Sequence, residues 1–141
     1  MITERRGFLR PAIVFSSLAM AGWSCVGALD IFPPTKRLPG GFRLVQFESR
    51  YYYVDRPKGG GGGIGGVLRG DIEQIGWNND AIVAWRTAMT GSERSGWMII
   101  DVHRGEVEGP FSEEQFRPMI QADKRLIGIA VRPVAEVWTG S

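Results

Sequence analysis

His103 is the only histidine in the chain of 141 residues, and Asp101 stands two positions before it. In a β-strand, residues two apart face the same side of the sheet, so the two side chains could form an acid–histidine pair. Such a pair activates a nucleophile in hydrolases. No nucleophile at a recognisable spacing completes the set. We therefore expect a non-catalytic protein, with a small hydrolase using Asp101 and His103 as the alternative.

Two groups of oxygen donors could bind a metal ion. Glu106 and Glu108 follow Asp101 and His103 closely, and the run 78–80 reads Asn-Asn-Asp. Neither group has the regular ligand spacing of the compact zinc or calcium motifs. We predict an exposed charged hairpin for the first group and a tight turn for the second, and we expect no metal and no cofactor.

The glycine-rich run from Gly59 to Gly66 is the one segment that could cradle a phosphate. A phosphate loop has a strand before it, a helix N-terminus after it and usually a Lys-Ser/Thr pair at its end. Val67, Leu68 and Arg69 follow here, without a helix signal. The sequence therefore favours a flexible hairpin connection over a nucleotide site.

Aromatic residues are the candidates for an interaction surface. In the run Tyr51-Tyr52-Tyr53 the first and third rings share one face of a predicted strand. That face is either a stacking platform for a sugar or nucleobase, or ordinary cross-strand packing, which we favour. We select Tyr51, Tyr53 and Trp97 as the candidate interaction surface.

Short apolar runs separated by turn residues predict a β-meander. The expected strands are 42–48, 51–55, 72–77, 81–85, 96–103, 106–108 and a last short one at 126–131. The strand at 81–85 is apolar on both faces, which predicts a central position in the sheet. The fold class is mainly β (α+β): a small antiparallel domain of five or six strands with one short C-terminal helix.

The predicted helix begins at Ser112, where Gln115 completes a capping box and Phe111 and Phe116 occupy the hydrophobic staple positions. Pro118 lies inside this helix and is expected to kink or split it. After the predicted strand at 126–131, Pro133 opens a short helix or coil that ends near Trp138.

The N-terminus has the layout of an export signal or membrane anchor. A basic segment at 4–10 precedes 19 residues, Pro11 to Leu29, that carry no charge, so an N-terminal apolar helix is expected. The basic segment resembles the twin-arginine export signal through Arg5, Arg6, Phe8 and Leu9, followed by a cation, although an acidic residue replaces the usual hydroxyl residue.

Three outcomes stay open for this N-terminal segment. Cleavage after Ala21 would release it, lipidation of Cys25 would anchor it despite a poor lipobox, and an uncleaved helix of 19 residues would span about 28 Å. The predicted organisation is a signal or anchor at 1–29, a proline- and glycine-containing linker at 30–41 and a β-rich domain at 42–141.

Charge and cysteine content exclude some classes of protein. The whole formal charge of +2 comes from the N-terminal segment, where three arginines (Arg5, Arg6 and Arg10) outnumber one acid (Glu4). The rest of the chain therefore has no net charge. A neutral domain has no basic field to attract nucleic acid, and we expect no such partner. With Cys25 as the single cysteine, neither an intrachain disulfide nor a cysteine-based zinc cluster can form.

Several runs resemble small bacterial envelope lipoproteins of uncharacterised function. The resemblance covers roughly residues 38–117 and is carried by the runs 38–44, 75–84 and 97–102, with Gly-Pro-Phe at 109–111. It implies an exported, surface-anchored β domain without a known catalytic residue. We expect an envelope protein that faces the periplasm or exterior and acts as an interaction or scaffold module, with the membrane and an envelope protein as partners. The alternatives are the hydrolase and an inhibitor or immunity-type binder of a secreted protein.

Overall fold

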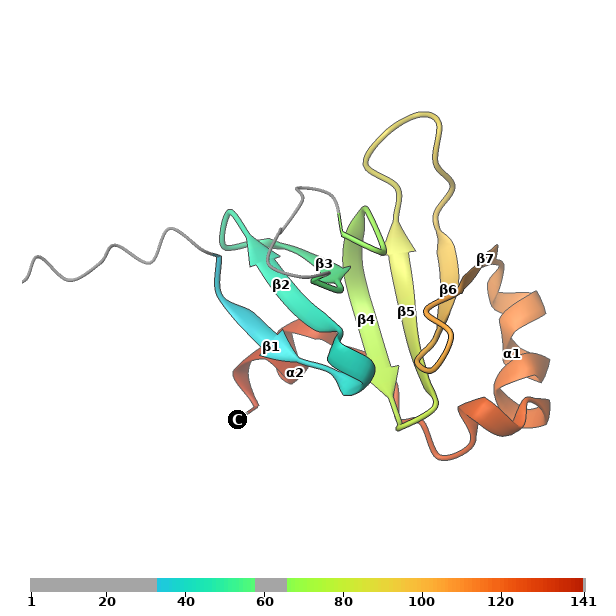
Figure 1. The fold of residues 1–141 in the computed structure, drawn as a ribbon. Helices are drawn as coiled ribbons and strands as arrows, with labels where there is room; N and C mark the ends of the chain where they lie inside the picture. The colour runs from blue at the N-terminus through green and yellow to red at the C-terminus, as the bar shows by residue number, and fades with distance from the viewer. Residues whose placement is uncertain (1–32, 58–65, 141) are drawn as a thin grey trace, which may run out of the picture.

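The computed structural model describes residues 33–57 and 66–140, and Figure 1 shows them in colour. The predicted export signal with Arg5, Arg6, Phe8 and Leu9, the candidate lipidation site Cys25 and the predicted N-terminal apolar helix lie outside the described residues. Most of the glycine-rich run lies outside them too. No helix in the described ranges has both the length and the hydropathy needed to cross a membrane.

The described chain forms two antiparallel sheets. One has three strands in the order β1-β2-β3 and the other has five in the order β7-β6-β5-β4-β8. The strands of the first are β1 (Thr35–Arg37), β2 (Arg43–Phe47) and β3 (Tyr51–Asp55). Those of the second are β4 (Asp71–Trp77), β5 (Ala81–Thr87), β6 (Gly96–Asp101), β7 (Val107–Phe111) and β8 (Arg132–Pro133). The predicted mainly β, antiparallel fold is confirmed, but the described residues hold eight strands in two sheets and not the five or six strands expected.

Helical segments complete the fold. The α-helices are α1 (Glu113–Ala122) and α2 (Val134–Thr139), and the short 3-10 helices are η1 (Pro39–Gly41) and η2 (Lys124–Leu126). In Figure 1, α1 and α2 lie on opposite sides of the five-stranded sheet. The predicted short helix after Pro133 is α2, so the described C-terminal part holds two α-helices and not one.

The five-stranded sheet is buried on both faces because its central strands alternate between two cores. Ile82 of β5 and Ile100 of β6 belong to the core shared with the three-stranded sheet and α2. Val83 and Ile99 belong to the core that α1 and η2 cover. The predicted central position of the strand at 81–85 is confirmed, since β5 occupies the middle of the sheet.

The predicted linker at 30–41 is too long. Residues 35–37 form β1, which pairs with β2 in the register Thr35 to Val45. Leu38 is buried in the core, and η1 follows it. Pro33 and Pro34 precede β1 and Pro39 begins η1, so the domain already begins at β1.

The predicted strand at 126–131 is wrong. Asp123 accepts the backbone N–H of Arg125 at 2.9 Å and thereby caps the short helix η2. Gly128 then has a φ of 77°, a left-handed conformation that interrupts an extended run. The strand in this part of the chain is β8 (Arg132–Pro133), which pairs with Gln74 and Ile75 at the edge of β4.

Helix α1 begins as predicted. The Ser112 side chain accepts the N–H of Gln115 at 3.2 Å, and the Gln115 side chain accepts the N–H of Ser112 at 2.9 Å. Pro118 does not split the helix, which continues to Ala122. Its ring lies on the exposed side of α1, where water can bond the carbonyl that lacks a helical partner.

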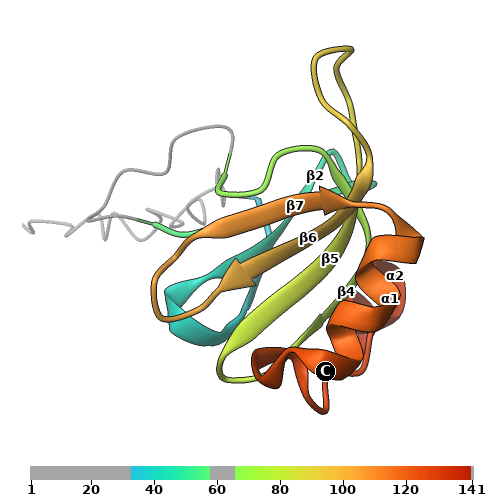
Figure 2. The ribbon, with the colours of Figure 1, turned by 90° about the vertical axis from the view of Figure 1, so that its right-hand side faces the viewer.

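The turns gather at two ends of the molecule, as Figures 1 and 2 both show. One end, which we call the upper end, holds the start of β1, the β2–β3 turn at 48–50, the segment 66–70 before β4 and the β5–β6 loop at 88–95. The other end, which we call the lower end, holds the β4–β5 turn at 78–80 and the β6–β7 turn at 102–106. Within the five-stranded sheet, antiparallel pairing fixes this arrangement, because β4 and β6 run from the upper to the lower end and β5 runs back. In the three-stranded sheet, β2 runs toward the β2–β3 turn at the upper end.

Candidate functional site

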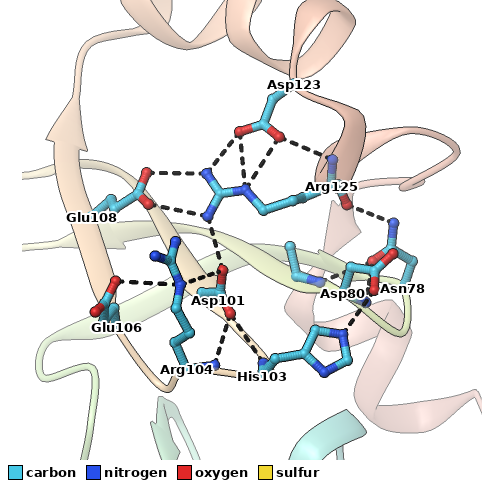
Figure 3. Close-up of polar contacts among 10 residues, drawn as sticks. Asn78, Asp80, Asp101, His103, Arg104, Glu106, Glu108, Asp123 and Arg125 are labelled. Atoms are coloured by element: carbon cyan, nitrogen blue, oxygen red, sulfur yellow. Dashed lines mark hydrogen bonds and ion pairs between the residues drawn. The ribbon is translucent and has the colours of Figure 1, made fainter.

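Charged side chains form one connected network at the lower end (Figure 3). Arg125 of η2 lies at its centre. Its Nη2 donates to Asp123 at 2.7 Å, and its Nη1 donates to Asp101 at 3.2 Å. The two carboxylate oxygens of Glu108 accept from Nη1 and Nη2 at 3.1 and 3.3 Å. One guanidinium therefore joins η2 to β7 and to the end of β6.

Asp101 is the buried member of this network, with a side chain only 7% exposed. Its carboxylate accepts the backbone N–H of His103 at 3.1 Å and that of Arg104 at 2.8 Å. It also accepts from Arg104 Nε at 3.3 Å and from Arg125. A buried carboxylate needs such donors to stay ionised, and here it uses them to fold the β6–β7 turn.

The acid that meets the imidazole is Asp80 and not Asp101. His103 Nε2 and Asp80 Oδ1 lie 2.8 Å apart, and both side chains are largely exposed. The predicted pairing fails because β6 ends at Asp101, so His103 lies in the following turn and not on the same strand face. Asp101 reaches only the backbone N–H of His103.

The turn predicted from the Asn-Asn-Asp run is confirmed. Asn78 Oδ1 accepts the backbone N–H of Asp80 at 2.8 Å and that of Ala81 at 2.9 Å, which is an Asx-type turn. Its Nδ2 donates to the carbonyl oxygens of Arg125 and Ile127 at 2.8 and 3.1 Å. The Asn78 side chain thus ties the β4–β5 turn to η2, and its oxygen is already occupied.

The charges of the network stabilise one another. Hydrogen bonding by the backbone N–H of Arg104, helped by the side chains of Arg125 and Arg104, lowers the pKa of Asp101 from its ordinary value of 3.8 to about 2. Hydrogen bonds from Arg125 also lower the pKa of Asp123. The same bonds, first with Asp123 and then with Glu108, raise the pKa of Arg125.

The two glutamates that could have supplied metal oxygens pair with arginines. Glu108 receives both Nη atoms of Arg125, and Glu106 lies 3.6 Å from Arg104 Nε. Within residues 33–57 and 66–140, no three His, Cys, Asp or Glu side chains form a group that could hold a metal ion. The arrangement fits a rigid structural cluster better than a reactive centre.

The aromatic candidates have different positions. Trp97 is only 5% exposed and stacks on Phe116 with the ring centroids 4.4 Å apart, so its selection as a surface residue is wrong. It packs in the core under α1 because β6 is buried on both faces. Tyr51 and Tyr53 are half-buried on the outer face of the three-stranded sheet, where their role in an interaction stays a prediction.

A shallow hollow of about 410 Å³ lies beside the N-terminus of α1 and is lined in part by Arg94, Pro110 and Ser112. The Ser112 side chain already caps this helix. Glu113 and Glu114 in the first turn add negative charge there. These carboxylates offset the positive end of the helix dipole beside the hollow.

Sequence reasoning missed the central residue of the network. Arg125 stands beside a segment predicted as a strand, and nothing in its spacing links it to Glu108 or Asp101. A local signal existed in Asp123, since an aspartate before Lys-Arg can act as an N-cap and end a strand prediction.

The chain matches no protein-family model, no curated protein and no solved structure.

Proposed function

We propose that this protein is a non-catalytic interaction module, held at a membrane of the cell envelope by its segment 1–29, whose lower end binds an envelope protein. Nucleic acid is not a partner in this proposal, because the domain that follows the N-terminal segment carries no net charge. The uncharged stretch from Pro11 to Leu29 is the reason for assigning a membrane.

The observation that carries the proposal is the position of the network relative to the start of the described chain. Pro34 O accepts the N–H of Gln46 at 3.1 Å, so the chain enters the domain beside the β2–β3 turn, at the upper end. The network of Arg125 lies at the lower end, because Asp101 and Arg104 stand at the end of β6 and in the β6–β7 turn. Figure 3 shows its contacts. A tether at the upper end would leave the lower end free to meet a partner.

The lower end suits a protein partner because hydrogen bonds hold its segments together and an exposed apolar residue lies next to its charged side chains. Ile127 is 64% exposed, next to the network that Arg125 and Asn78 hold in place. The exposed side chains of Asp80 and Glu106 add polar groups at the same end. Protein interfaces commonly combine an apolar centre with a polar rim, and a pre-organised surface loses less entropy on binding.

The test uses the full-length chain, tagged and isolated from membranes of the cells that make it. Ile127→Asp should abolish co-purification of a stoichiometric partner. Met89→Asp, which changes a residue of similar exposure (56%) at the upper end, should leave it unchanged. Full-length protein in the soluble fraction would refute membrane attachment. Equal partner yields for both variants would refute binding at the lower end.

A further inference from the structure

We propose that the upper end rests on the lipid surface of the membrane, with Phe47 at the acyl boundary and Arg50 at the lipid phosphates. This inference rests on the proposed attachment of the segment 1–29. It adds a second, direct contact between the folded domain and the bilayer, and so gives the domain a fixed orientation.

The length of the tether favours this contact. The uncharged stretch ends at Leu29, four residues before the described chain starts at Pro33. Four residues span at most about 14 Å even when fully extended. The N–H of Gln46 bonds Pro34 O at 3.1 Å, so Gln46 lies beside the point where the chain enters the domain. Phe47 is the next residue after Gln46. The tether would therefore hold the β2–β3 turn close to the headgroup layer.

Apolar side chains are exposed at this end. Phe47 is 49% exposed at the end of β2 and lies opposite the half-buried Tyr51. Met89 is 56% exposed in the β5–β6 loop, which lies at the same end of the molecule in both views (Figures 1 and 2). Aromatic rings are enriched at membrane–water interfaces, where an apolar body and a polar tip are both accommodated.

The charges at this end complement anionic headgroups. The upper-end segments 48–50, 66–70 and 88–95 carry three arginines and two glutamates. The lower-end turns at 78–80 and 102–106 carry one arginine and two acids. The guanidinium of Arg50 lies 4.9 Å from the ring centroid of Tyr51, so a cation and an aromatic ring stand together next to Phe47. Cations close to a membrane surface are attracted by anionic lipids.

The β2–β3 turn is built to present these side chains. The N–H of Arg50 bonds Phe47 O at 3.3 Å, and the two central residues, Glu48 and Ser49, have φ values of 50° and 60°. Positive φ at both central positions is the pattern of a tight type I′ hairpin turn. Phe47 and Arg50 therefore project from a short turn and not from a long loop.

The experiment places the photo-crosslinking amino acid benzoylphenylalanine at one position at a time in the full-length chain. Positions 47 and 89 test the upper end, and position 127 is the matched control, an exposed apolar residue at the lower end. After irradiation of native membranes, the intact mass of the protein shows whether a phospholipid has been added. A thermal melt of each variant confirms that it is folded.

We expect phospholipid adducts at positions 47 and 89 and none at position 127. Three results with membrane-bound protein would overturn this inference and leave membrane attachment standing. They are no lipid adduct at position 47, a protein adduct at position 47, or as much lipid adduct at position 127 as at position 47. Protein found only in the soluble fraction would overturn both, so the two failures are distinguishable.

Discussion

Arg125 Nη1 and Asp101 Oδ2 lie 3.2 Å apart, and this ion pair fastens η2 to the end of β6. The same carboxylate holds the backbone of the β6–β7 turn through the N–H groups of His103 and Arg104. Two segments that are 24 residues apart thus share one buried acceptor. The conformation of the lower end therefore depends on the charges of this pair.

Replacing Arg125 with methionine should destabilise the protein. The change keeps much of the side-chain volume but leaves Asp101 buried without its long-range partner. We expect a loss of about 2 to 3 kcal/mol in the free energy of unfolding, somewhat below the range for fully buried pairs because the Arg125 side chain is 28% exposed. Urea unfolding followed by tryptophan fluorescence measures this loss.

Arg117→Met is the matched control for that variant. Arg117 pairs with Glu113 at 3.8 Å on the surface of α1, and both side chains are largely exposed. Exposed pairs contribute little, so we expect a change of no more than about 0.5 kcal/mol. Similar losses for the two variants would mean that the network adds no more stability than a surface ion pair.

Acid should unfold the protein partly through Asp101. The pKa of Asp101 is lowered to about 2 in the folded protein and is about 3.9 in an unfolded chain. The unfolded state therefore takes up the proton first as the pH falls, and the stability from this carboxylate is lost between about pH 4 and pH 2. Urea unfolding at several pH values should show this slope, and Asp101→Asn should make it shallower. An unchanged slope in that variant would contradict the assignment.

The sequence predicted the fold better than it predicted the site. Alternating apolar residues are local signals, and they placed β3 and β5 at the right positions. The capping box at Ser112 is local too, and it located the start of α1. The network is different, because Arg125 meets Glu108 and Asp101 only after η2 has packed against the sheet. The side-chain partner of His103 was missed for a related reason, since the end of β6 depends on hydrogen bonds to Asp101 that no periodicity reveals.

Asp71→Asn should stabilise the protein at neutral pH. Burial raises the pKa of Asp71, and the nearby charge of Glu73 raises it further, although the N–H of Tyr52 bonds the Asp71 side chain at 3.2 Å. Since the ionised form is disfavoured in the fold, this group costs stability as the pH rises through its raised pKa. Asparagine removes that cost and keeps an acceptor for Tyr52.

Melting temperatures at pH 7 and at pH 4 check this prediction. The gain for Asp71→Asn should shrink at pH 4, where the native carboxyl group is more protonated. Asp71→Ala, which removes the acceptor for Tyr52, should be less stable than Asp71→Asn at both pH values. A gain for Asp71→Asn that is the same at both pH values would show that burial of the charge is not its cause.

His103→Ala separates the binding proposal from the hydrolase alternative. The imidazole pairs with Asp80 at 2.8 Å, but both side chains are largely exposed, so the free energy of unfolding should change by no more than about 0.5 kcal/mol. Under the binding proposal, the variant should still complement a strain that lacks the protein. It is compared with wild type at equal protein levels in the membrane fraction. The variant could instead fail to complement although it is folded, correctly located and gives an unchanged partner yield. That result would favour a catalytic role for His103.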